Sequence, residues 1–400
     1  MNAVDTGFIL VCAALVMFMT PGLALFYGGM VRSKNVLGTV MHSFILIALA
    51  SVVWSLVAYS LSFGSSIGGI IGGLDFAFLR GVGMDNGGSP ADNLPHLTFM
   101  IFQCMFAVIT PALITGAFAE RIKFGPFLVF SALWVIFVYS PMCHWVWGGG
   151  WMGEMGALDF AGGAVVHMSS AAAALAACLV LGKRVGHGKQ AFIPHNIPLT
   201  VLGAGILWFG WFGFNAGSAL AADGIAANAF VTTHLAAAAA ALGWIFVEWM
   251  HRGKPTTLGA ASGAVAGLVA ITPGAGFVTP MPALLIGGLA GAICYGGILL
   301  KSRFGYDDSL DVVGIHGLGG TWGALATGLF ASIGAKGLFY GNPAQLWIQF
   351  VSVVATWVFC FVASYVLFKT VDAVMGLRVS EEEEVKGLDV SAHSESAYQL

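Results

Sequence analysis

Long apolar runs, separated by short polar or Gly/Pro-containing breaks, follow one another along most of the chain. A bilayer core about 30 Å thick requires about 20 mainly apolar residues per helix, and the runs reach that length. The predicted fold is an all-α polytopic membrane protein, with a transmembrane domain over residues 1–378. We predict eleven membrane-spanning helices, near residues 7–30, 36–63, 97–119, 124–146, 161–182, 197–216, 225–250, 257–273, 281–300, 311–333 and 345–374.

The composition agrees with this pattern. Of the 400 residues, 58% are hydrophobic and 9% are charged, and the mean hydropathy is +0.88. A soluble domain has about 25% charged residues, so a large soluble domain is excluded. The six cysteines lie in apolar runs without a CxxC pair, which favours buried small side chains over a disulfide framework or a metal site. We expect neither a metal nor a cofactor.

The positions of the basic residues predict the orientation of the helices. Cytoplasmic loops are enriched in Lys and Arg, and here a basic pair or cluster follows every odd-numbered span up to span 9. The only basic residues in the loops that follow even-numbered spans are Arg80 and Lys336. The sequence therefore predicts an outside N-terminus and an inside C-terminus. The basic residues are Arg32, Lys34, Arg121, Lys123, Lys183, Arg184, Lys189, Arg252, Lys254, Lys301 and Arg303, with Lys369, Arg378 and Lys386 at or beyond the last span.

Five spans that begin outside end inside, so a second set of five would have the opposite orientation. The span count therefore permits an inverted five-plus-five repeat. In transporters built on that plan, the substrate path runs near the midplane where the two halves meet.

Two spans carry a histidine in an apolar run. His167 lies eight residues after Asp159 on span 5, and His316 lies five residues after Asp311 on span 10. Because the two spans would run in opposite directions, pseudo-symmetry predicts that the imidazoles are neighbours. Such histidines can be functional or can simply tie two helices by a hydrogen bond. Asp159 and Asp311 stand where helices begin and fit N-capping, although Asp159 could also attract cations electrostatically.

Aromatic residues gather near the predicted outer ends of three spans. Phe102 and Phe106 are four residues apart on span 3, Trp147 ends span 4, and Phe214 and Ser218 are four residues apart on span 6. Each fits an interfacial belt or helix packing. Together they also fit an aromatic cage with a hydroxyl, which would bind a small cation.

Several stretches, in order along nearly the whole chain, resemble the ammonium transporter (Amt/Mep/Rh) family, and its bacterial Amt-type branch in particular. They include ALFYGGMVRSKNVL, FQCMFA, VWGGG, DFAGGAVVH, GWFGFNAGSA and DVVGIHG. The resemblance implies eleven helices with an inverted repeat, a homotrimer with one pore per subunit, and no enzymatic activity. The substrates would be ammonium or ammonia, with methylammonium as an analogue. We expect a multi-pass protein of the cytoplasmic (inner) membrane of a prokaryote, with no nucleic-acid partner.

The resemblance also assigns roles to individual residues. It implies an outer ammonium site, a stacked aromatic gate and a pore with two histidines. Phe102 would belong to the cage or narrow the path. The site is Phe106, Trp147 and Ser218, the gate is Phe106 with Phe214, and Trp211, His167 and His316 line the pore.

The tail over residues 379–400 is polar and acidic. Composition alone is typical of a disordered solubilising tail. The resemblance instead implies a folded cytoplasmic regulatory segment that contacts neighbouring subunits and helps a PII-type signalling protein to block the exits.

Dehydrating ammonium in a narrow apolar pore costs far more free energy than passing neutral ammonia. We therefore expect ammonium to be deprotonated and ammonia to pass the histidines, which can accept and pass a proton. Alternatives are an ammonium sensor, a general cation or proton-coupled carrier, and a membrane redox protein with His167 and His316 on a b-type haem. An intramembrane hydrolase is disfavoured, because the chain contains neither HExxH nor GxSxG.

Overall fold

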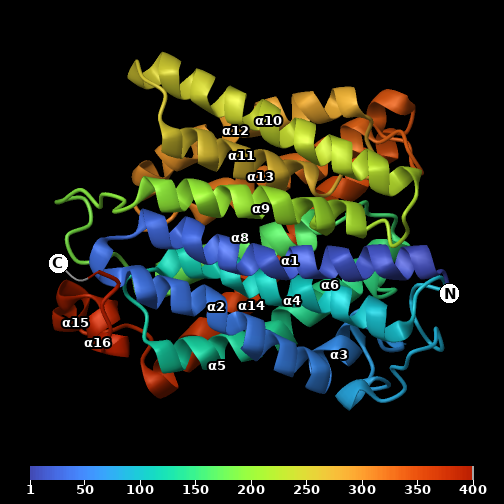
Figure 1. Ribbon diagram of the computed structural model, residues 1–400, viewed down its shortest axis with the longest axis horizontal. Helices are drawn as coiled ribbons and strands as arrows, with labels where there is room; N and C mark the ends of the chain where they lie inside the picture. The colour runs from blue at the N-terminus through green and yellow to red at the C-terminus, as the bar shows by residue number, and fades with distance from the viewer. Residues whose placement is uncertain (399–400) are drawn as a thin grey trace.

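A computed structural model describes residues 1–398 as a bundle of long, roughly parallel helices (Figure 1). In this range, a helical segment matches each of the eleven predicted spans. The segments are α1 (Ala3–Met30), α2 (Val36–Val53) with η2 (Trp54–Ala58) and α3 (Tyr59–Phe63), α4 (His96–Phe118), α5 (Phe124–Trp134) with η4 (Val135–Tyr139) and α6 (Ser140–Trp147), η5 (Gly163–Met168) with α8 (Ser169–Leu181), α9 (Ile197–Gly217), α10 (Gly224–Arg252), α11 (Thr257–Ile271), α12 (Pro280–Phe304), η6 (Val313–Gly317) with α13 (Leu318–Phe330), and α14 (Pro343–Met375).

Short elements connect these helices or follow them. They are η1 (Ser33–Asn35), the two-stranded hairpin of β1 (Ser66–Ile67) and β2 (Ile71–Gly72), η3 (Ala77–Leu79), α7 (Trp151–Glu154), η7 (Leu338–Tyr340), α15 (Glu381–Lys386) and α16 (Leu388–His393). Within residues 1–398, nine of the long segments are long and apolar enough to cross a membrane, and α11 is a shorter apolar helix. The all-α membrane fold is confirmed, whereas eleven crossings and their direction stay predictions.

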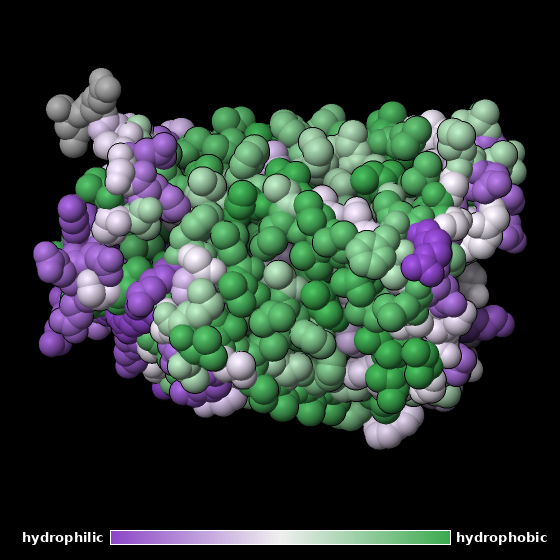
Figure 2. All heavy atoms as spheres, turned by 90° about the horizontal axis from the view of Figure 1, so that it is seen from below, coloured by the Kyte–Doolittle hydropathy of each residue, from purple (hydrophilic) through white to green (hydrophobic). Residues whose placement is uncertain are grey.

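The surface has the distribution expected of a membrane protein. Apolar side chains cover the middle of the face shown in Figure 2, and polar side chains gather at its two ends. The N-terminus lies at one end of the bundle, and α15 and α16 lie at the other (Figure 1). We call these the N-terminal end and the tail end.

The first helices of the two predicted halves, α1 and α9, pack together along the middle of the bundle (Figure 1). Glycines make their close approach possible. A Cβ on Gly203 of α9 would overlap the backbone of Phe26 in α1, and one on Gly22 of α1 would overlap Ile206 in α9. Small residues at such crossings let apolar helices gain van der Waals contact in a lipid environment.

Four helical segments contain a π-helical stretch, and two of these stretches carry the histidines. His167 lies in η5 and His316 lies in η6. A π-helix is rare and is found frequently at functional sites. The apolar pattern did not predict these stretches.

A buried ion-pair network joins the loops at the tail end. Arg184 contacts the carboxylates of both Glu120 (3.1 Å) and Asp307 (2.9 Å), and Arg32 contacts Glu120 at 2.8 Å. Burial opposes ionisation, but the hydrogen bond from Arg32 and the charge of Arg184 lower the pKa of Glu120 below its ordinary value. Burial likewise opposes ionisation of Asp307, and the hydrogen bond and charge of Arg184 outweigh it and hold its pKa well below the usual range.

The tail is folded through residue 393 and packs on these loops. Helix α15 begins with a capping box made by Ser380 and Glu383. Glu384 accepts hydrogen bonds from the Val185 backbone (2.7 Å) and from Arg378 (2.8 Å), and Asp389 accepts one from the Gly38 backbone (2.8 Å). The structure therefore favours a folded segment over a disordered tail. The last two residues of the predicted tail, 399–400, lie outside the described residues.

Because Glu120 and Asp307 have lowered pKa values, their contribution to stability is present above pH about 4 and is lost as the pH falls below it. Arg184→Ala should lower the free energy of unfolding by about 3 kcal/mol at neutral pH, because it leaves Asp307 buried without its main partner. The variant should also lose part of the acid dependence. Unfolding in detergent micelles, monitored between pH 3 and 8, measures both effects. Lys189→Ala, an exposed change in the same loop, is the control, and equal stability of the two variants would contradict the expectation.

Candidate functional site

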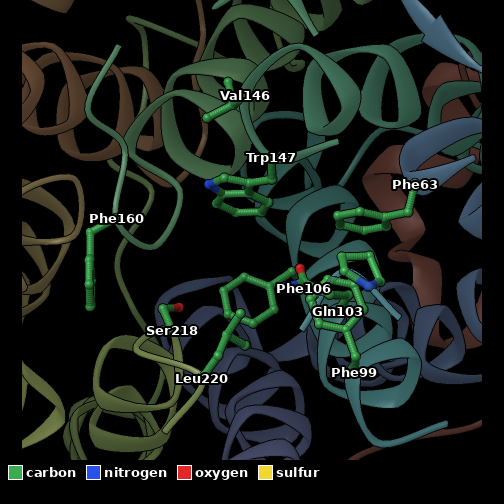
Figure 3. Close-up of a pocket in the computed structure, with 10 residues that line it drawn as sticks. Phe63, Phe99, Gln103, Phe106, Val146, Trp147, Phe160, Ser218 and Leu220 are labelled. Carbon is green, nitrogen blue, oxygen red and sulfur yellow. The ribbon is translucent and has the colours of Figure 1, made fainter. Parts of the chain in front are cut away.

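A cavity of about 320 Å³ opens at the N-terminal end of the bundle (Figure 3). The end of α6 supplies Trp147, α4 supplies Phe106, and the residue that follows α9 is Ser218. We call this the aromatic cavity. Its remaining lining is Phe63, Pro90, Phe99, Gln103, Val146, Phe160 and Leu220.

The three predicted site residues face this cavity together (Figure 3). The rings of Phe106 and Trp147 meet edge to face, with centroids 5.8 Å apart. The indole N–H of Trp147 donates a hydrogen bond to the Asp159 carbonyl oxygen (2.9 Å), which fixes the plane of the ring. The hydroxyl of Ser218 donates to the Phe214 carbonyl oxygen (2.9 Å), so its oxygen lone pairs remain available to a guest.

Two phenyl rings close the inner side of the cavity. Phe106 and Phe214 are buried, and their centroids are 4.4 Å apart. Phe102 packs edge to face against Phe106 with centroids 5.0 Å apart, and it does not line the cavity. A guest larger than a few atoms would have to displace these rings in order to go deeper.

Beyond the phenyl pair, the two histidines lie next to each other. Their Nδ1 atoms are 3.2 Å apart, and the rings are nearly parallel with centroids 5.3 Å apart. Trp211 stacks on His167 with centroids 5.4 Å apart, and the Phe214 ring lies 6.1 Å from the same imidazole. The prediction that the histidines are neighbours agrees with this geometry.

The space beside the histidines is very small. Its volume of about 10 Å³ is about enough for one water molecule, and its other walls are almost entirely apolar. The Nε2 atom of His167 is buried there without a hydrogen-bond partner among residues 1–398. A buried nitrogen without a hydrogen-bond partner lowers the stability of the fold, so this atom favours the binding of a small polar molecule. The remaining lining is Met19, Leu23, Phe26, Ile109, Leu113, Val166, Leu207 and Val265.

A carboxylate fixes the start of each histidine segment. The carboxylate of Asp159 accepts hydrogen bonds from four successive backbone N–H groups, those of residues 162–165, at 2.5 to 3.2 Å. In the second half, Asp308 accepts one from the Val313 backbone at 2.8 Å. Both aspartates precede their histidines by eight residues, which is what an inverted repeat would require.

The expected capping role of Asp311 is therefore corrected. Its carboxylate forms an ion pair with Lys301 at the end of α12, and it makes no cap hydrogen bond to η6. The stretch DDSLD offers three aspartates, and the loop geometry turns Asp308 toward the helix start. Equal spacing from the two histidines was the sequence signal that could have identified it.

A hydrogen-bonded chain beside the two histidines orients Trp211, and sequence reasoning missed its other members. The indole N–H donates to the hydroxyl oxygen of Thr272 (2.9 Å), and that hydroxyl donates to the Leu268 carbonyl oxygen (2.8 Å). Next to it, the Asn215 amide donates to Thr233 (2.8 Å). All of these side chains are buried, so the indole is held flat against His167.

A second cavity, of about 680 Å³, lies at the tail end. Its walls include Glu248, Arg252, Asp311 and Ile315, the residue before His316. The molecule therefore has two wide cavities at opposite ends, with the narrow histidine site between them.

The sequence model of the Ammonium Transporter Family matches residues 7–398. The chain belongs to this family. The ammonium transporter of Bacillus subtilis is 57% identical over 401 residues, which cover 99% of this chain and 98% of the relative. The ammonium transporter Amt1 of Archaeoglobus fulgidus is 49% identical over 397 residues, covering 98% of this chain and 99% of the relative.

Solved structures agree with the family assignment. The crystal structure of Saccharomyces cerevisiae Mep2 has a TM-score of 0.87 at 36% identity, covering 95% of this chain and 91% of that one. A structure described as a sensor Amt protein has a TM-score of 0.91 at 30% identity and covers 98% of both chains. The resemblance seen in the sequence motifs is confirmed, and the function is ammonium transport across a membrane.

The geometry of the two histidines disfavours the haem alternative. Metal–imidazole bonds of about 2 Å would require axial nitrogens about 4 Å apart on opposite faces of a porphyrin. The Nδ1 atoms are closer than that, at 3.2 Å, and the space of about 10 Å³ beside them is far too small for a porphyrin.

We predict that the hydrogen bond from Trp211 to Thr272 supports transport by holding the indole beside His167. Thr272→Val keeps the shape of the side chain but removes the oxygen, so the indole loses its partner and the wall beside His167 loosens. We expect the maximal transport rate to fall about fivefold, with little change in the half-saturating ammonium concentration. Ammonium uptake into proteoliposomes measures both quantities. Thr272→Ser should restore the rate, and equal rates for the valine and serine variants would contradict the role.

Proposed function

We propose that the aromatic cavity recruits ammonium through Phe106, Trp147 and Ser218. The two rings present π-electron density, and the hydroxyl oxygen of Ser218 can accept a hydrogen bond from the cation. The shared lining and the edge-to-face contact of the rings support this role. Methylammonium, with one added methyl group, fits the same chemistry.

Beyond the recruitment site, the Phe106 and Phe214 pair acts as the gate. No charged side chain lines the narrow space behind it, so an intact ammonium ion would lose its hydration without a counter-charge. Neutral ammonia loses far less, so ammonium gives up its proton to water in the aromatic cavity and ammonia passes the gate.

Ammonia then passes Trp211, His167 and His316. Facing Nδ1 atoms 3.2 Å apart can share one proton, with one nitrogen donating and the other accepting. The Nε2 atom of His167 would then remain available to form a hydrogen bond with the ammonia molecule. This buried atom without a protein partner, in a space for one small molecule, is the observation that carries the proposal.

A general cation carrier is the second candidate mechanism, and the neutral lining of the constriction argues against it. An ammonium sensor is not favoured, because the two relatives described above are transporters, although one structural neighbour carries the name of a sensor. The proposed function is transport and includes no enzymatic reaction.

We further propose that the chain works as a homotrimer in the cytoplasmic membrane of a prokaryote, with the tail end inside. Residues 379–400 would form its regulatory tail. The folded tail, packed on the basic loops beside the second cavity, supports docking of a PII-type partner at this end.

Trp147→Leu tests the recruitment site. Leucine keeps an apolar side chain there but removes the π face, so the half-saturating ammonium concentration should rise about five- to tenfold with normal folding. Uptake into proteoliposomes at varied ammonium concentration provides the measurement. Trp347→Leu, an exposed tryptophan at the start of α14, is the matched control. An unchanged concentration dependence for Trp147→Leu would rule out the recruitment role.

Substitution of His167 tests the selectivity mechanism. A carboxylate in His167→Asp can replace part of a cation's hydration, so currents of permanently charged cations such as caesium should exceed those of the parent. His167→Ala adds no charge and should mainly change how the proton travels. Currents on solid-supported membranes with proteoliposomes provide the measurement. If both variants keep the parent's selectivity and current, the histidines serve only to tie the helices together.

A further inference from the structure

The segment that precedes η5 contributes to the aromatic cavity without regular secondary structure of its own. Residues 157–162 form neither a helix nor a strand. Two of them still carry parts of the site. The Asp159 carbonyl oxygen accepts the indole N–H of Trp147, the Asp159 carboxylate holds the start of η5, and the Phe160 ring lines the cavity. Backbone groups outside helices and strands need other hydrogen-bond partners, so whatever holds this segment also holds the site.

One side chain of α14 holds the segment from both sides of a single residue. The carboxamide oxygen of Gln349 accepts a hydrogen bond from the Leu158 N–H (2.7 Å), and its NH₂ group donates to the Leu158 carbonyl oxygen (2.8 Å). The same NH₂ group donates to the Ala324 carbonyl oxygen of α13 (3.1 Å). Gln349 is 1% exposed, so water does not compete for these bonds. We call this arrangement the Gln349 clamp.

The neighbouring packing fixes the carboxamide in turn. Gly328 of α13 leaves room for it, because a Cβ there would lie 2.9 Å from the Cγ atom of Gln349. One helical turn earlier, Gln345 donates to the Gly156 carbonyl oxygen (2.9 Å), just before the same segment. The segment is therefore anchored on α14, the span that belongs to neither half of the predicted repeat.

The Gln349 clamp is uncharged, whereas the loop before η6 is held by a charged side chain. There, Lys301 donates to the Asp308 carbonyl oxygen (2.7 Å). A fixed positive charge beside the aromatic cavity would oppose the binding of a cation, and a carboxamide donates hydrogen bonds without adding a net charge. A glutamine therefore suits the end of the molecule at which ammonium would be recruited.

We propose that Gln349 is a positioning residue for the recruitment site, and that it sets the place of the Trp147 indole through Leu158 and Asp159. The inference rests on the recruitment role of Trp147 proposed above. Gln349 does not line the aromatic cavity, so it acts through the segment alone. Without the clamp, the Leu158 backbone loses both partners, the segment moves, and the Asp159 carbonyl oxygen no longer fixes the plane of the indole.

A double-mutant cycle on ammonium uptake into proteoliposomes tests this dependence. Gln349→Met keeps the length of the side chain but removes all three hydrogen bonds, and it should raise the half-saturating ammonium concentration about fivefold. In the Trp147→Leu background, the same change should have less than about a twofold effect, because the indole that the clamp positions is already absent. The same factor in both backgrounds would mean a merely structural role and would overturn the proposal.

A second variant and a control accompany the cycle. Gln349→Asn keeps a buried carboxamide but is one methylene too short for the clamp, so it should give the same pattern and replaces Gln349→Met if that variant does not fold. Thr356→Val, a buried change further along α14, removes a hydroxyl that bonds only within the helix and should leave the half-saturating concentration unchanged. If Trp147→Leu alone has no effect, the recruitment role and this inference both fail. If Trp147→Leu has its effect and the Gln349 variants have none, only this inference fails.

Hydrogen exchange provides a measurement that does not depend on transport. The Leu158 amide should exchange about tenfold faster in Gln349→Met than in the parent, because its acceptor is gone, while amides of α9 keep their protection. Mass spectrometry of peptides from the purified protein in detergent follows both regions. Equal protection of Leu158 in the two proteins would contradict the clamp.

Discussion

The cost of removing a charge from water constrains every part of this transport path. An ion in a narrow apolar space loses most of its hydration free energy unless the protein supplies a counter-charge. The constriction between the two wide cavities supplies imidazoles and an indole and has no charged side chain in its lining. Such a site accepts a neutral polar molecule at much lower cost than its protonated form. The aromatic cavity, which is wider and open to water, is where a cation can still be held.

A neutral constriction works only if its few polar atoms are held in position, and the scaffold does this from outside the path. Carboxylates of Asp159 and Asp308 hold the first turns of the two histidine segments. Both segments are π-helical where the histidines lie, and the Nδ1 edges of the two nearly parallel rings point toward each other. Thr272 fixes the indole that stacks on His167. The positions of the two imidazoles and the indole therefore depend on hydrogen bonds made outside the constriction.

The spans could be predicted from the sequence because apolar length is a local property, and each predicted run coincides with a helical segment. The candidate residues were also recognisable, because an ionisable side chain in an apolar run is rare. The supporting partners were not. Arg184 and Asp307 are 123 positions apart, and only the fold brings them together. The choice of Asp308 over Asp311 depends on a loop conformation in which Lys301 captures the second carboxylate, and the π-helical turns leave no mark in the hydrophobic pattern.

Potassium tests the central claim most directly, because it has the charge and about the size of ammonium but has no proton to give up. Purified parent protein in liposomes would receive matched pulses of ammonium and potassium, with uptake and current recorded for each. If only a deprotonated guest passes the histidines, ammonium uptake will saturate while potassium gives neither uptake nor current above protein-free liposomes. A potassium current comparable with the ammonium signal would contradict the account, because it would mean that an intact ion crosses the constriction.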